Sequence, residues 1–299
     1  MSERVLAVTG ATGFIGRSLV PVLRSKGRNV RALVRRPDEY KVPSVEARKA
    51  DLLEPATLET ALEGVHTAFY LVHSMSGKSD SSFVEKDRIA AVNFLKAAET
   101  AGVQRIIYMG GLGEVGPGLS EHLRSRTEVG RILQSGCVRT TILRAAIILG
   151  RDGASWEMLR QLIEKLPVMV TPRWLETRCQ PIALRDVLGY LEGCLTNEGT
   201  VGGAFDIGGP DILTYRQMLH TVAEMLEKKR YILPIPVLSP RLSTYWVDLV
   251  TDVPAALANP LIEGLKNEVI CRENRIREIV PIPLTSFREA VALALIGKV

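Results

Sequence analysis

Residues 9–16 read TGATGFIG, and this stretch decides the fold of the 299-residue chain. Its glycines have the spacing GxxGxxG; an apolar run at 5–8 precedes them and a helical pattern ending near Gly27 follows. A glycine turn at that place lets the backbone approach a phosphate with no Cβ in the way, and the helix N-terminus adds free N–H groups and partial positive charge. The alternative is a turn that is only structural. The context favours the pyrophosphate site of a dinucleotide, with these candidate residues: Gly10, Thr12, Gly13, Phe14, Ile15 and Gly16.

Strand and helix patterns alternate over the first 150 residues. Short apolar runs predict strands at 5–8, 29–34, 67–72, 105–109 and 140–143, and apolar spacing predicts helices at 55–62, 83–101 and 120–133. Such alternation builds βαβ units. We therefore predict the α/β class: a Rossmann-type, doubly wound parallel sheet over residues 1–150, to which residues 181–208 return. Residues 151–180 and 209–299 are predicted to form a smaller C-terminal substrate lobe over the carboxyl edge of the sheet.

The end of the second predicted strand indicates which dinucleotide is bound. NAD sites place an acidic residue there to accept a hydrogen bond from the ribose 2′-hydroxyl, whereas this chain has Arg35 and Arg36. A guanidinium pairs well with the 2′-phosphate of NADP. The alternative is a solvated arginine pair at a strand end. We predict NADP(H) as the cofactor.

Composition excludes several other classes. The net charge is only +5 and the basic residues form no block, so we expect no nucleic-acid partner. No run of about 18 apolar residues is present, so we expect no integral membrane segment. The four cysteines are far apart, without zinc spacing, which predicts reduced thiols and no metal site. With no recognisable signal peptide, these features predict a cytoplasmic protein.

Several stretches together resemble the short-chain dehydrogenase/reductase superfamily: TGATGFIG, LVRRP at 33–37, YLVHS at 70–74, LRAAIILG at 143–150 and FDIGGPDILTYRQML at 205–219. The likeness is greatest to its atypical, extended-type branch, which includes NmrA-like proteins and the accessory NADPH-binding subunit of respiratory complex I. The resemblance implies that residues 144–150 lead into the substrate lobe. It implies that Asp51 and Leu52 line the adenine, and that three residues run past the nicotinamide ribose: Leu71, Val72 and His73. Independently of the family, Asp186 is a natural N-cap for a helix returning to the first domain.

The expected catalytic pattern is absent. Active members carry a serine, and a tyrosine and lysine in YxxxK, but here glycines 110–111 replace the serine, His122 the tyrosine and Arg126 the lysine. In one interpretation His122 is the general acid and Arg126 holds the cofactor ribose. In the other, the site has lost this chemistry. Weaker candidate proton donors are His73, Ser74 and Tyr108.

The favoured function is an NADPH-dependent oxidoreductase acting on an unidentified small molecule, with a hydrophobic compound as one candidate; the alternative is a non-catalytic NADPH-binding sensor or scaffold. A sugar-nucleotide epimerase would need NAD and the tyrosine–lysine pair. Apolar residues at 238–250, with Tyr245 and Trp246, and at 255–265 suit a substrate pocket, a membrane-surface segment or core packing. The helices at 83–101 and 120–133 are candidates for a homodimer face. A polar and aromatic cluster could meet an anionic group or cap loops: Arg173, Trp174, Arg178 and Gln180.

Overall fold

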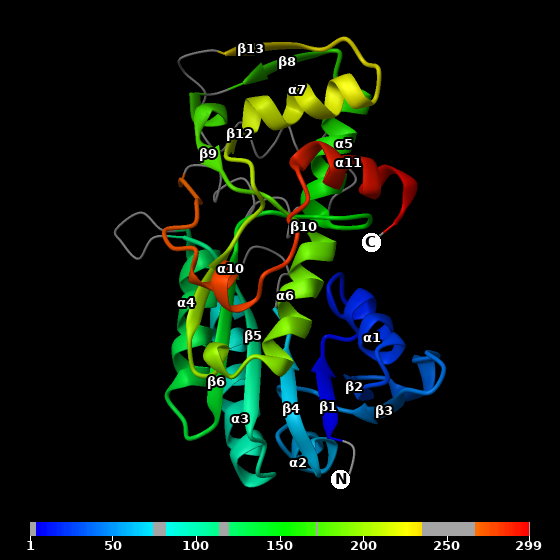
Figure 1. Ribbon diagram of the computed structural model, residues 1–299, viewed down its shortest axis with the longest axis vertical. Helices are drawn as coiled ribbons and strands as arrows, with labels where there is room; N and C mark the ends of the chain where they lie inside the picture. Colours follow the sequence, from blue (N-terminus) through cyan, green and yellow to red (C-terminus); the bar gives the residue numbers. More distant parts are fainter. Residues whose placement is uncertain (1–3, 74–81, 114–119, 172, 235–266, 299) are drawn as a thin grey trace.

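A seven-stranded parallel sheet forms the centre of the protein (Figure 1). The computed structural model describes residues 4–73, 82–113, 120–171, 173–234 and 267–298. The strand order β3-β2-β1-β4-β5-β6-β11 reverses direction between β1 and β4, which is the topological switch point where open α/β sheets bind ligands. This order confirms the predicted Rossmann-type fold class. The strand bounds are β1 Val5–Thr9, β2 Asn29–Val34, β3 Glu46–Lys49, β4 Val65–Tyr70, β5 Arg105–Gly111, β6 Arg139–Ala145 and β11 Ala204–Ile207.

Helices cover both faces of this sheet, because alternate strand residues point to opposite sides. On one face, strand residues such as Val8 and Ile107 pack with α1 (Gly16–Ser25) and α6 (Leu184–Thr196). On the other, their neighbours Ala7 and Ile106 pack with the remaining three helices. These are α2 (Ala56–Leu62), α3 (Ser82–Thr100) and α4 (Glu121–Gln134). Two apolar layers therefore hold the sheet rigid and fix the places where its strands end.

A third apolar cluster forms the upper part of the molecule in Figure 1, beyond the end of β1 that carries the arrowhead. It is built from helices α5 (Ala154–Lys165), α7 (Tyr215–Met225) and α11 (Phe287–Ile296), with Trp156 among its most buried side chains. Short strands join around it in pairs: β7 (Ile148–Leu149) with β10 (Ile182–Ala183), β9 (Arg178–Cys179) with β12 (Leu213–Thr214), and β8 (Val168–Thr171) with β13 (Tyr231–Pro234). The short helices are η1 (Pro37–Glu39), η2 (Arg173–Glu176), η3 (Glu198–Thr200) and α10 (Arg275–Ile279).

Two elements differ from the sequence prediction. The edge strand β3 was not predicted, because its sequence EARK is charged, three of its four residues are exposed and none is buried. It is held by pairing with β2 and by an ion pair of 2.7 Å between Arg31 Nε and Glu46 Oε2. Strand β4 ends at Tyr70, two residues earlier than expected. Within the described part of the chain, no helix is both long and apolar enough to cross a membrane.

The prediction that Asp186 caps a helix is wrong. The cap of α6 is Ala183, and Asp186 lies inside the first helical turn with 2% of its surface exposed. Its two carboxylate oxygens accept hydrogen bonds of 2.8 Å from the backbone N–H and the hydroxyl of Thr285. Burial raises the pKa of Asp186, although the Thr285 hydrogen bonds oppose this. The residue therefore anchors the segment before α11 to the sheet domain.

Candidate active site and cofactor turn

The glycine turn has the geometry that a pyrophosphate requires. Gly10 has φ +65°, a left-handed conformation that favours glycine, and the N–H of Gly13 donates to Gly10 O at 2.9 Å. A Cβ on Gly16 would overlap the carbonyl oxygen of Gly10, so no other residue fits there. Helix α1 starts at this point with no side-chain cap at Ile15 and no acidic residue in its first turn. The uncapped N-terminus thus leaves N–H groups and positive potential for phosphate oxygens.

The end of β4 packs directly against this turn. Thr9 Oγ1 donates to Phe69 O at 3.1 Å and accepts from the N–H of Leu71 at 3.0 Å, which ties β1 to β4. A Cβ on Gly10 would lie 3.1 Å from Leu71 O and 3.3 Å from Val72 Cγ2. The segment 71–73 therefore borders the glycine turn at the switch point of the sheet.

The remaining predicted cofactor residues lie at the same edge. Arg35 and Arg36 are both exposed just beyond β2, and Arg36 pairs with Glu39 at 3.2 Å. Asp51 is half-buried, and its Oδ1 accepts from the N–H of Leu53 at 2.9 Å, which shapes the turn after β3. Leu52 is 8% exposed and belongs to the core. These positions suit cofactor contacts, which stay predictions.

Three side chains form a row that includes His73, the last residue of the segment 71–73, together with Asp87 from α3 and His122 from α4. His73 Nδ1 lies 2.7 Å from Asp87 Oδ2, and His73 Nε2 lies 2.8 Å from His122 Nδ1. Asp87 comes from α3 and also accepts from the hydroxyl of Ser125, on α4, at 2.9 Å. The side chains of Asp87 and His73 are 4% and 11% exposed, so Asp87 is the more buried of the two, and the half-buried His122 lies at the other end of the row. Across the described ranges, no group of three His, Cys, Asp or Glu side chains is arranged to hold a metal ion.

Both imidazoles are held in their neutral form. Burial, reinforced by the positive charge of Arg126 and by His73, lowers the pKa of His122 to about 2. Burial and Arg126 also lower the pKa of His73, but the hydrogen bond and the charge of Asp87 oppose this. Of the two rings, His73 is therefore the one that the surroundings equip to carry a proton.

Arg126 occupies the space that a serine would need. A Cβ on Gly111 would lie 3.0 Å from Arg126 Cδ and 3.1 Å from Leu123 Cδ2. The guanidinium donates to Met109 O at 3.3 Å, while its buried Nε has no hydrogen-bond partner within the described residues. Tyr108, a weaker candidate donor, is buried and donates to Arg126 O at 3.0 Å, which leaves it no free proton for a substrate. The lack of a Cβ at Gly111 thus leaves room for the side chain of Arg126.

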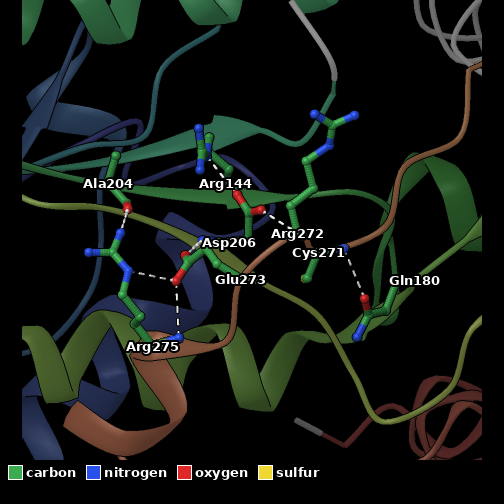
Figure 2. A network of polar contacts seen from close by, with 8 residues as sticks. All are labelled: Arg144, Gln180, Ala204, Asp206, Cys271, Arg272, Glu273 and Arg275. Carbon is green, nitrogen blue, oxygen red and sulfur yellow. Dashed lines mark hydrogen bonds and ion pairs between the residues drawn. The ribbon is translucent and has the colours of Figure 1, made fainter.

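The far side of this edge is held by a network around Asp206 (Figure 2). Arg144, at the end of β6, forms a 2.7 Å ion pair with Asp206 Oδ1, while Asp206 Oδ2 accepts from the N–H of Arg272 at 3.0 Å. Gln180 accepts from the N–H of Cys271 at 3.0 Å and donates to Gly209 O at 2.7 Å. Of the predicted polar cluster, Gln180 therefore binds backbone, and Arg178 pairs with Glu268.

Asp87 is the site residue that the sequence reasoning missed. The signal was available: in the helix pattern, position 87 lies four residues after Phe83 and three before Ala90, on the apolar face. A carboxylate on a buried helix face calls for a partner. Ser74, the side chains of Arg173 and Trp174, and the apolar stretches 238–250 and 255–265 lie outside the described residues.

Comparisons with known proteins identify a family for the chain. The profile of a family described as NAD(P)H-binding matches residues 10–160. The mitochondrial NADH dehydrogenase (ubiquinone) 1 alpha subcomplex subunit 9 of Arabidopsis thaliana is 24% identical over 277 residues, which cover 89% of this chain and 69% of that protein.

Solved structures share the fold. A nucleoside-diphosphate-sugar epimerase from Staphylococcus aureus superposes with a TM-score of 0.77 at 17% identity, over 96% of this chain and 99% of that one. The triphenylmethane reductase of Citrobacter sp., solved with NADP(H), has a TM-score of 0.77 at 20% identity, over 97% of this chain and 99% of that one.

Proposed function

Because the chain belongs to the NAD(P)H-binding family, we propose that it is an NADPH-dependent oxidoreductase of the atypical short-chain dehydrogenase/reductase type. The substrate class is a carbonyl compound or an activated alkene, held between the sheet edge and the lobe of residues 151–180 and 209–299. One observation carries the proposal: an imidazole, His122, stands at the position of the missing tyrosine and is bonded to the strand end that borders the glycine turn.

Family membership confirms two predictions made from the sequence. The chain belongs to an NAD(P)H-binding family related to the short-chain dehydrogenase/reductase superfamily, and its cofactor is of the NAD(P)H type. Membership of the atypical branch and the preference for NADP(H) over NAD(H) are part of the proposal, and the NADP(H)-bound reductase of the same fold supports them. The cytoplasmic location and the homodimer stay predictions.

The residues present fit this cofactor. The cradle around Gly16 excludes any Cβ, and the buried Nε of Arg126 lacks a partner within the described ranges, as expected of a group that a ligand completes. Gly10 to Gly16 would hold the pyrophosphate, Arg35 and Arg36 the 2′-phosphate, and Arg126 the ribose near the nicotinamide. When bound, the cofactor supplies hydride, and the protein supplies position and a proton.

His122 is the residue that we propose delivers this proton. With its pKa lowered to about 2, the ring is neutral, so it does not act as an isolated imidazolium acid. A neutral imidazole still has one N–H, and which nitrogen carries it depends on the neighbouring His73. The chemistry of the site therefore depends on the pair and not on His122 alone.

A specific observation favours a second candidate, a non-catalytic NADPH-binding sensor or scaffold. None of the serine, tyrosine and lysine is present, and a side chain at position 111 would contact Arg126. The Arabidopsis relative is itself named as a subunit of a larger enzyme.

Consumption of NADPH separates the two candidates. The purified protein is saturated with NADPH and screened against aldehydes, ketones, quinones and activated alkenes, with the loss of NADPH absorbance as the readout. An oxidoreductase consumes NADPH with at least one class, and His122→Phe removes most of that turnover. The control is His220→Phe, since His220 is an exposed residue of α7 and takes no part in the row formed by Asp87, His73 and His122. If the protein binds NADPH and none of the compounds oxidises it, the oxidoreductase is refuted and the non-catalytic sensor or scaffold remains.

A further inference from the structure

We propose that the Asp87–His73 pair takes up the proton used by the enzyme from solvent, and that His122 passes it to the substrate by changing tautomer. This inference rests on the proposed oxidoreductase function and names the groups that supply its proton. It follows from the order of the three side chains: carboxylate, then imidazole, then imidazole, with contacts of 2.7 Å and 2.8 Å.

The resting tautomers follow from the buried end of the row. Asp87 is an acceptor, so His73 must present Nδ1–H to it. In a neutral His73 the other nitrogen, Nε2, is then an acceptor, so His122 must donate Nδ1–H to it. His122 Nε2 consequently carries a lone pair in the resting state. The nitrogen of His122 that can accept a proton is therefore the one that does not contact His73.

One added proton reverses this arrangement. His73 then carries protons on both nitrogens, with Nδ1–H donated to Asp87 and Nε2–H donated to His122 Nδ1. His122 must hold its own proton on Nε2, where it is a donor. His122 stays neutral in both states, and the positive charge resides on His73 beside the carboxylate. This distribution agrees with the very low pKa of His122 and the support that Asp87 gives to His73.

For a carbonyl substrate the step balances as follows. Hydride adds to the carbonyl carbon, and the resulting alkoxide oxygen takes the proton from His122 Nε2. The Nε2–H bonding pair stays on that nitrogen, and His73 gives its Nε2 proton to His122 Nδ1. His73 ends neutral, with its Nδ1–H still on Asp87. The products are the alcohol, the oxidised nicotinamide and a deprotonated relay, which solvent recharges.

The charged and titratable groups around the relay leave Asp87 as its only described source of negative charge. Arg126, from α4, disfavours a proton on either histidine. Tyr70, from β4, and Tyr108, from β5, have raised pKa values and stay neutral, about 12 for Tyr108. Ser125 donates to Asp87 and so partly satisfies its carboxylate.

Tautomer-resolved NMR of the ring nitrogens tests the relay in the free protein, without turnover. The chain has only four histidines, so single substitutions assign every signal, and the exposed His220 serves as an internal reference. At neutral pH we expect both His73 and His122 as Nδ1–H tautomers. On acidification, His73 gains the first proton, and His122 changes to the Nε2–H tautomer in the same step while remaining neutral. An Nε2–H His122 at neutral pH, or independent titration of the two rings, would overturn the proposal.

Two variants on Asp87 and its partner sharpen the test. Asp87→Asn keeps an oxygen acceptor for His73 but removes the charge, so protonation of His73 moves to lower pH by about one unit or more. The matched control, Ser125→Ala, keeps the carboxylate and removes a donor from it, so protonation of His73 stays put or moves to higher pH. Equal shifts in the two variants would contradict the role of the Asp87 charge in protonating His73. The wild-type tautomers stand as evidence even if a variant does not fold. Absence of NADPH turnover would count against the proposed function alone, and wrong tautomers against the relay alone.

Discussion

Restoring the missing serine with Gly111→Ser is expected to destabilise the protein. The new Cβ would meet Arg126 Cδ at 3.0 Å and Leu123 Cδ2 at 3.1 Å, both closer than ordinary van der Waals contact. Overpacking of this kind costs about 1–3 kcal/mol. Loss of the flexibility of glycine in the unfolded chain offsets about 0.4–1 kcal/mol of it. The expected net loss in the free energy of unfolding is therefore roughly 0.5–2 kcal/mol.

A double-mutant cycle with Arg126→Ala shows whether the arginine is the cause. The free energy of unfolding is measured by urea titration for the wild type, both single variants and the double variant. Because Arg126→Ala removes Cδ, serine at position 111 should cost less in the double variant, by about 0.5 kcal/mol or more. The remaining cost comes from Leu123. If Gly111→Ser were neutral, or equally costly in both backgrounds, the steric account of the missing serine would be wrong.

Three further predictions concern the cofactor and the junction between the two parts. Arg35→Ala should weaken NADPH binding by roughly 10-fold or more in calorimetry, as expected for loss of a charge-assisted contact, and leave NADH binding unchanged. The control is Arg48→Ala, which removes an exposed arginine of β3. An unaltered ratio of NADPH to NADH affinity would show that Arg35 does not recognise the 2′-phosphate. Asp186→Ala leaves two donors of Thr285 without acceptors and should lower the free energy of unfolding by about 2–4 kcal/mol, seen as an earlier urea midpoint. Gly16→Ala should abolish NADPH binding, because its Cβ overlaps the turn; calorimetry showing normal affinity would mean that the turn can rearrange.

The sequence predicted the parts of the fold whose signal is local. The buried strand β1 contains the predicted apolar run at 5–8, and α4 begins within one residue of the predicted helix at 120–133, where the hydroxyl oxygen of Ser120 accepts from the N–H of Leu123. The charged edge strand β3 carries no such signal, because its stability comes from pairing with β2. Asp186 was misread because the partner that explains it, Thr285, lies 99 residues away.

The candidate site shows the same division. The glycine turn could be identified from spacing alone, since its chemistry is local. The relay could not, because Asp87, His73 and His122 come from different elements and meet only when α3 and α4 dock beside the end of β4. His122 was picked out by its place in a motif, whereas its tautomer and charge are set by neighbours that no motif contains.

The network around Asp206 has a consequence for synthesis on the ribosome. Strand β11 completes the sheet, yet its Asp206 takes a backbone N–H from Arg272, and Asp186 takes both its donors from Thr285. Until residues 272–285 have left the exit tunnel, two carboxylates of the sheet domain lack these donors, and burial without them is costly. In the nascent chain, β11 and α6 should therefore be less stably packed until the residues 272–285 are available late in translation. Synonymous changes that slow translation would then matter most near the codons for this segment.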